Sequence, residues 1–167
     1  GFILIGISSN SPAGMTAVVY FVLIYVFSNL AAFAVAGLVE SKTGKLKIDD
    51  YKGFYQTNPF LSWMIALALF SLAGVPPTAG FFGKLFLITA GASQASYFVI
   101  IIVSLNLVIS LYYYLRIIRA IFMDKNETPV EKIAVPMPVK IGLIICAAGI
   151  VATGFISFIY EYIQSLS

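Results

Sequence analysis

Long apolar runs, separated by short groups of charged residues, limit what this chain can fold into more than any other feature of its sequence. Residues 13–39, 97–122 and 138–164 are each predominantly apolar and long enough to cross a bilayer, which takes about 20 residues of helix. Only 10% of the residues are charged, whereas about 25% are charged in water-soluble domains. The sequence therefore predicts an all-α, polytopic bundle of transmembrane helices.

A fourth apolar stretch, residues 59–91, is too long for one plain span and too short for two, and the basic residues decide between these counts. A single crossing places nine of the ten lysines and arginines on one side of the membrane. A double crossing splits the nine four against five and removes the usual excess of basic residues in cytoplasmic loops. We therefore predict one broken span. The nine basic residues are Lys42, Lys45, Lys47, Lys52, Arg116, Arg119, Lys125, Lys132 and Lys140.

The predicted organisation is a single membrane domain over residues 1–167, with four spans preceded by the end of a fifth. In chain order the ranges are 1–10 (end of a truncated helix), 13–39 (span), 40–58 (polar loop), 59–91 (broken span), 97–122 (span), 123–137 (polar loop) and 138–164 (span). The first residues form a half-span with neither Met nor signal-peptide charges, so we expect a fragment of a longer subunit. The expected location is a bacterial inner membrane or an organelle's inner membrane, with both polar loops in the cytoplasm or matrix.

The segment "GVPPTAG", residues 74–80, interrupts the fourth stretch near its middle. Pro76 and Pro77 remove two backbone donors, and their rings obstruct the preceding turn, so a regular helix cannot continue. Gly74 and Gly80 let the chain bend on either side. Backbone groups freed in this way cannot face lipid, so the break must pack against protein or line a water-filled cavity. Discontinuous helices of this kind are typical of ion and proton transporters.

Lys84 lies one turn beyond the break. It is the one basic residue that a single crossing does not place with the other nine on one side of the membrane. A charged amine at that depth is costly unless it is neutralised, paired or hydrated, so Lys84 is the candidate proton relay. The alternative is that its stem lifts the amine toward the far membrane surface, about 10 Å away along the helix. Position alone leaves both interpretations open.

Other polar residues inside the spans are candidate partners of Lys84 in a proton path or polar lining. Such residues more often bond a neighbouring helix or their own backbone. The candidates are Ser28, Asn29, Thr78, Asn106 and Ser110. The tyrosines at 112–114 stand beside Arg116 and Arg119, where anchoring at the membrane surface is the expected role. No acidic residue lies in a span interior, so a carboxylate partner for Lys84 must come from elsewhere.

Redox chemistry is not expected in this chain, which has no histidine and one cysteine. Those residues cannot assemble a haem or iron–sulfur ligand set, so neither a metal nor a bound cofactor is predicted. No glycine motif follows a strand to cradle a phosphate, and no nucleic-acid partner is expected.

Several segments together resemble a known family. "SLAGVPPTAGFFGKLFLI" followed by "SLYYYLRIIRAIF", with "GFILIG", "YVFSNLAAFAV" and "DDYKGF", resembles the C-terminal half of the antiporter-like, proton-translocating membrane subunits of respiratory complex I, NADH:quinone oxidoreductase. Among these, subunit N is the best match. Sister subunits tend to carry a second lysine in the helix that matches 13–39, whereas Asn29 stands near that position here.

This resemblance implies that Lys84 corresponds to the lysine of the second of two broken helices, which passes protons between a central polar axis and the outer half-channel. It implies a subunit of an oxidoreductase, with proton movement driven by electron transfer from NADH to quinone in other subunits. NADH, FMN, iron–sulfur clusters and quinone are then expected in those partners. The implied partners of this fragment are the missing N-terminal half, the other membrane subunits and the lipid bilayer.

Two alternatives remain beside a proton-pumping subunit of complex I. One is a cation/proton antiporter or a membrane-bound hydrogenase subunit built on the same fold. The other is a structural membrane scaffold in which Lys84 only reaches for the membrane surface.

Overall fold

The computed structural model describes residues 1–76, 78–92 and 97–155, and within these ranges every regular element is a helix. Pro77 and residues 156–164 of the last predicted span lie outside the described residues. The helices are α1 (Phe2–Ser8), α2 (Pro12–Thr43), the 3₁₀ helix η1 (Ile48–Tyr51), α3 (Phe54–Thr57), α4 (Pro59–Ala73), α5 (Ala79–Ala92), α6 (Tyr97–Phe122) and α7 (Met137–Phe155). The predicted all-α class is confirmed.

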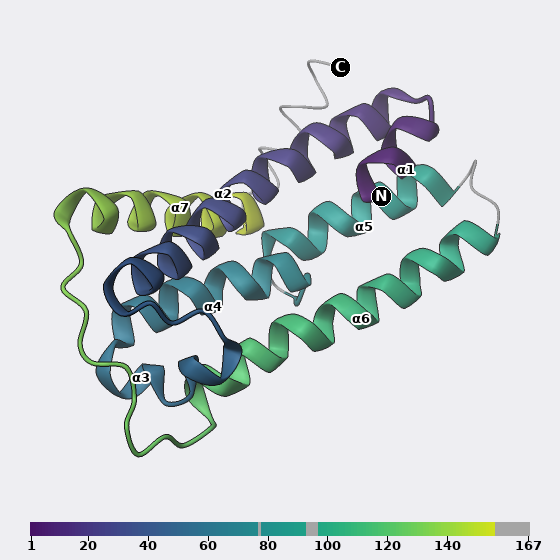
Figure 1. Ribbon diagram of the computed structural model, residues 1–167. Helices are drawn as coiled ribbons and strands as arrows, with labels where there is room; N and C mark the ends of the chain where they lie inside the picture. The colour runs from purple at the N-terminus through teal and green to yellow at the C-terminus, as the bar shows by residue number, and fades with distance from the viewer. Residues whose placement is uncertain (77, 93–96, 156–167) are drawn as a thin grey trace.

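Three helices, α2, α6 and α7, are long and apolar enough to cross a membrane, whereas α4 and α5 are shorter. With 15 and 14 residues, α4 and α5 each extend about 22 Å, less than the roughly 30 Å of a hydrocarbon core. They follow one another along α2, which packs against both (Figure 1). The two short helices therefore form one discontinuous span in a bundle of four spans, with α1 as an additional short helix against α2 and α5.

The two polar segments of the chain meet at one end of the bundle (Figure 1). The N–H of Gly53 donates to the carbonyl of Ala120 at 3.2 Å, and the hydroxyl of Thr57 donates to the carbonyl of Val130 at 2.6 Å. The nine basic residues outside the broken span belong to these segments and the helix ends that enter them. A single crossing by α4 and α5 thus keeps the basic residues together at one end.

Residues 40–58, expected as a polar loop, are mostly helical. Helix α2 continues to Thr43 and ends at Gly44, whose φ of 68° is the left-handed conformation that glycine adopts without strain. After it, Tyr51 and Phe54 turn inward, and Phe54 is completely buried. Burial of these two rings fixes η1 and α3 against the end of α6. The charged residues around them had indicated a loop instead.

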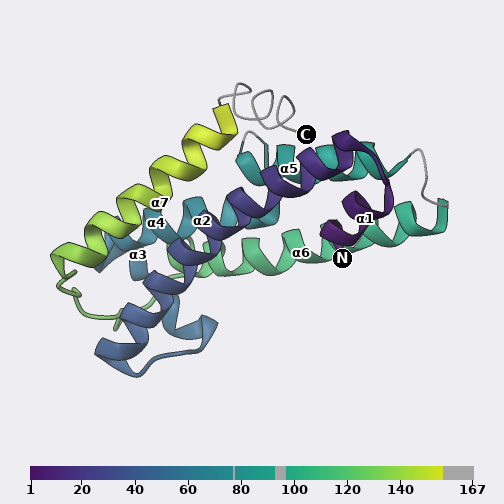
Figure 2. The ribbon, with the colours of Figure 1, turned by 90° about the horizontal axis from the view of Figure 1, so that it is seen from above.

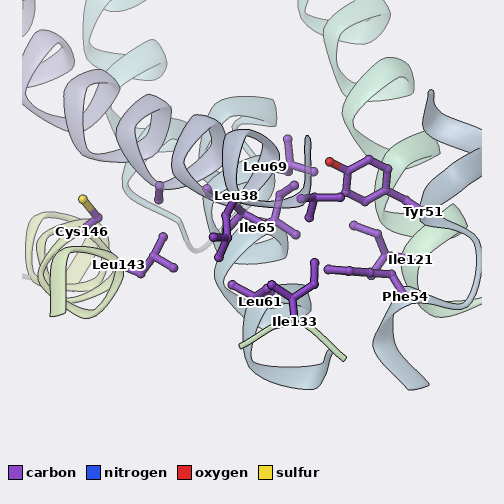
Figure 3. Packing of buried hydrophobic residues seen from close by; sticks show 14 of the residues in the cluster. Leu38, Tyr51, Phe54, Leu61, Ile65, Leu69, Ile121, Ile133, Leu143 and Cys146 are labelled. Atoms are coloured by element: carbon purple, nitrogen blue, oxygen red, sulfur yellow. The ribbon is translucent and has the colours of Figure 1, made fainter. Parts of the chain in front are cut away.

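The main hydrophobic core lies near the basic end and joins every element from α2 onward except α5 (Figure 3). Its members include Leu38, Tyr51, Phe54, Leu61, Ile65, Leu69, Ile121, Ile133, Leu143 and Cys146. Helices α6 and α7 flank the α2–α4 pair on different sides (Figure 2). The outer face of α6 stays exposed, as at Leu105 and Val108, which is the expected state of a surface that faces lipid or another helix.

Candidate functional site

The break between α4 and α5 is a capped helix end followed by a tight turn. Gly74 has a φ of 78°, its N–H donates to the Ser71 carbonyl at 3.0 Å, and the N–H of Val75 donates to the Phe70 carbonyl at 3.1 Å. This pair of bonds is the Schellman motif, which satisfies two of the last carbonyls of a helix. The hydroxyl of Thr78 then donates to the Val75 carbonyl at 2.7 Å. Among the described residues of the turn, none donates a backbone N–H to the carbonyls of Leu72 and Ala73.

Lys84 satisfies those two carbonyls from the neighbouring helix. Its Nζ lies 2.8 Å from the carbonyl oxygen of Leu72 and 3.2 Å from that of Ala73, and only 8% of the residue is exposed. The C-terminus of a helix carries partial negative charge, so a cation is favourable there. Lys84 of α5 therefore caps α4 across the break.

The amine points toward the break, which is the direction opposite to the far end of α5. A Cβ on Gly74 would stand 3.1 Å from the Cδ of Lys84. The absence of a side chain at Gly74 therefore leaves room for the lysine side chain to pass. On another side the Nζ lies 5.5 Å from the centre of the Phe2 ring, within the range of a cation–π contact. In this position the amine lies on the side of the break and not at the far end of α5.

A cavity of ≈ 140 Å³ opens beside the Lys84 side chain between α1, α2, α4, α5 and α6. One water occupies about 30 Å³ in the liquid, so the cavity has room for a few molecules. Its apolar lining includes Phe21 and Ile24, whereas its polar lining is made of hydroxyl groups and the lysine. The hydroxyl-bearing residues are Tyr25, Ser28, Ser71, Ser110 and Tyr114. The cavity is thus able to hold hydrogen-bonded water next to the amine.

Ser28 and Ser110, predicted as polar lining, both border this cavity. Ser28 is fully buried and its hydroxyl donates to the hydroxyl of Ser71 at 2.8 Å, whereas Ser110 also donates to its own helix at the Asn106 carbonyl, at 2.7 Å. Thr78 lies in the break itself.

Asn29 and Asn106 do not join the site. Asn29 is half-buried and Asn106 is exposed, and each side chain donates to a backbone carbonyl four residues earlier in its own helix, at 2.8 and 2.9 Å. They follow the common alternative for polar residues in spans, which is to satisfy themselves on their own helix.

Gly80, predicted only as a place to bend, allows the two helices of the break to touch. A Cβ at Gly80 would overlap the carbonyl oxygen of Ser71, so only glycine fits there. Of the four predicted residues of the break, Gly74, Pro76 and Gly80 are described. Pro76 occupies the turn, where a residue without an N–H leaves no unpaired donor.

Sequence reasoning did not single out Ser71, Tyr25, Tyr114 or Phe2. A signal for two of them exists, because Tyr25 stands three residues before Ser28 and Tyr114 four residues after Ser110, spacings that share a helix face. Tyr114 was expected to anchor the chain with its two neighbours. Only Tyr112 and Tyr113 are largely exposed, whereas Tyr114 faces the cavity of Lys84.

Charged pairs among the described residues lie at the basic end, between Lys52 and Asp49 at 2.7 Å and between Arg119 and Asp124 at 3.3 Å. The hydrogen bond from Lys52 lowers the pKa of the exposed Asp49 carboxyl and raises the pKa of the lysine. Neither pair includes Lys84. In the part of the chain that the structure describes, no group of three His, Cys, Asp or Glu side chains gathers to hold a metal ion.

The chain is similar in sequence and in fold to known proteins. The chain is 46% identical, over its whole length, to NADH-quinone oxidoreductase subunit N of Azobacteroides pseudotrichonymphae, and 42% identical over 98% of its length to the subunit N of Phocaeicola vulgatus. It spans 35% of the length of each of these relatives. Its fold is similar to a chain of respiratory complex I from Thermus thermophilus, solved with bound aureothin, with a TM-score of 0.60 and 21% identity, covering 92% of this chain and 42% of that one.

A family model described as "NADH:quinone oxidoreductase/Mrp antiporter, TM" matches residues 1–110. These residues include α1, α2, both halves of the broken span with Lys84, and the part of α6 that ends at Ser110. The match therefore covers the break, the lysine and most of the cavity lining. This chain belongs to the NADH:quinone oxidoreductase/Mrp antiporter transmembrane family.

Proposed function

We propose that this chain is part of a proton-translocating membrane subunit of an NADH:quinone oxidoreductase, in which Lys84 takes up and releases protons during turnover. The observation that carries the proposal is the placement of Lys84: a buried amine at a helix break, next to a cavity lined with hydroxyl groups. A lysine can act as a relay only if it can lose its proton and meet a path for it. Water in the cavity, bonded to Ser28, Ser71 and Ser110, supplies that path.

The remaining parts of this proposal concern the whole protein. The relatives are about three times as long as this chain, so the rest of the polypeptide completes the pathway and supplies a carboxylate partner for Lys84. Other membrane subunits of the complex are its neighbours. NADH, FMN, iron–sulfur clusters and quinone belong to partner subunits, and the membrane is a bacterial inner membrane or an organelle's inner membrane, with the basic end toward the cytoplasm or matrix.

The test is NADH-driven proton translocation by the intact complex in vesicles, with Lys84→Ala and Lys84→Arg introduced into the full-length subunit. Assembly is checked on a native gel, and Lys42→Ala, at the exposed basic end, is the control for loss of one lysine. We expect both Lys84 variants to lose translocation, because an arginine does not release its proton. Lys42→Ala keeps it. Translocation that survives both Lys84 changes in assembled complexes overturns the proposal in favour of a scaffold.

A cation/proton antiporter is the second candidate, because the matching family model covers antiporters as well as oxidoreductase subunits. The same vesicles separate the two. An antiporter acidifies or alkalises the lumen when a sodium gradient is applied without NADH, whereas the proposed subunit moves protons only while electrons flow to quinone.

A further inference from the structure

A second cavity, which shares no lining residue with that of Lys84, opens at the basic end between the start of α4, the start of α7 and the segment that leads into α7. Its volume is ≈ 310 Å³. Two lysines, Lys132 and Lys140, line it, and the rest of its wall is mainly apolar, with Phe60, Ile133 and Val135. Nothing in the proposed proton path uses this cavity.

The two lysines share this space without an ion-pair partner among the described residues. The lining contains no carboxylate, and neither lysine belongs to an ion pair within the described residues. The Nζ of Lys140 lies 5.7 Å from the centre of the Phe60 ring, within the range of a cation–π contact. Two ammonium groups in one cavity repel each other, and an anion placed between them removes that repulsion.

The segment that carries Lys132 is held in place by a buried side chain. Asn58, 5% exposed, donates from Nδ2 to the carbonyl of Glu131 at 3.1 Å and accepts at Oδ1 from the N–H of Ile133 at 2.7 Å. The backbone is therefore held on both sides of Lys132, at Glu131 and at Ile133. Because the wall is already ordered, a ligand does not have to bear the entropic cost of ordering it.

The depth of the cavity matches the boundary between lipid and water. It lies where α4 and α7 begin, and the same end of α4 carries the exposed Trp63, whose ring is 5.2 Å from that of Phe122. Tryptophan is enriched at this level of the membrane. A freely dissolved anion would gain nothing from the apolar wall, whereas a phospholipid presents a phosphate to the lysines and acyl carbons to Phe60 and Val135.

We propose that this cavity binds the headgroup of an anionic phospholipid, with Lys132 and Lys140 on the phosphate. Basic pockets between helices at the cytoplasmic side are suited to such headgroups. The site is independent of the role of Lys84, so the two proposals stand or fall separately.

The experiment is photo-crosslinking of the full-length subunit, in its purified complex, with a phosphatidylglycerol that carries a photoactivatable group near the headgroup. We expect adducts on the peptides that contain residues 57–61 and 132–140. Excess phosphatidylglycerol competes, whereas equal phosphatidylcholine and millimolar inorganic phosphate do not. The double variant Lys132→Gln/Lys140→Gln is expected to bind about 25-fold more weakly, the product of about five-fold for each lysine at a membrane surface.

Two further variants keep the outcome interpretable. Lys42→Gln/Lys125→Gln removes the same charge from exposed positions at the same end that line neither cavity, and it keeps the adducts. Lys132→Arg/Lys140→Arg keeps the charge, so it also keeps them and shows that a replaced pair still folds. Adducts that persist in the glutamine variant, or that phosphatidylcholine competes away equally, overturn the proposal. Competition by inorganic phosphate overturns it in favour of a free anion.

Discussion

Gly80 lies against the carbonyl group of Ser71, so close that a methyl group on Gly80 would occupy the position of the carbonyl oxygen. The contact joins the first turn of α5 to the last turn of α4. It sets the two halves of the broken span side by side at the break and brings Lys84 within reach of the carbonyls of Leu72 and Ala73.

The first prediction concerns that contact. Gly80→Ala forces the ends of α4 and α5 apart, and overpacking of this kind costs about 1–3 kcal/mol. We expect a lower thermal midpoint for the purified complex and less full-length subunit in the membrane. Gly37→Ala is the matched control, because a Cβ there meets no atom within 4 Å and alanine favours the helix by about 0.5–1 kcal/mol. Equal midpoints for the two variants contradict the close approach.

A second prediction separates the capping role of Lys84 from proton transfer. Lys84→Met leaves the carbonyls of Leu72 and Ala73 without a donor, which costs about 1–3 kcal/mol for a buried polar group. Lys84→Arg still donates to them, so its stability stays close to that of the unchanged protein while proton translocation is lost. Thermal unfolding and vesicle acidification, measured on the same preparations, give the comparison. If Lys84→Met unfolds at the same temperature as Lys84→Arg, the amine does not cap α4.

The third prediction concerns the buried hydroxyl pair of Ser28 and Ser71. Each single change to alanine is expected to cost about 0.5–1.5 kcal/mol, and the double variant about as much as one single change, because the same hydrogen bond is lost. A double-mutant cycle on thermal stability measures this coupling. Strictly additive costs mean that the two hydroxyls act independently.

A fourth prediction concerns Asn58, which ties α4 to the segment before α7. Asn58→Ala removes the bonds to Val130, Glu131 and Ile133 and leaves the buried N–H of Ile133 without an acceptor, at a cost of about 1–3 kcal/mol. We expect faster proteolysis of residues 123–137 in the folded subunit. Asn106→Ala serves as the comparison, since that side chain is exposed and bonds only its own helix, and its effect should stay within about 0.5 kcal/mol. Equal cleavage rates would show that Asn58 holds nothing in place.

The broken span and its lysine were predictable because proline, glycine and charge are rare inside apolar stretches, so each carries a strong local signal. The faces of the helices were not. Helices that are apolar all round give no periodic pattern, so the sequence could not distinguish Ser28, which is fully buried against α4, from Asn29 next to it, which is only half-buried and bonds its own helix. That distinction depends on which neighbour α2 packs against.

The segment after α2 illustrates the same limit. Its charges indicated a loop, but the burial of Tyr51 and Phe54 depends on α6 and α4, which lie beside it only once the bundle has formed. Sequence position likewise grouped Tyr114 with Tyr112 and Tyr113. Successive residues of a helix point about 100° apart, so Tyr114 faces the cavity whereas Tyr113, one residue earlier, is exposed.

The capped end of α4 has one more consequence. Two peptide oxygens and an aromatic face surround the Lys84 ammonium in the way that water molecules surround an ion, so the chain itself supplies a solvation shell made of neutral groups. A cation held by a carboxylate strands an opposite charge in a poorly polarisable interior each time its proton departs. A cation held by dipoles leaves only a polar helix end when its proton departs. The carboxylate proposed to come from the rest of the polypeptide therefore does not have to touch the amine, and the site can be filled and emptied with little rearrangement of its surroundings.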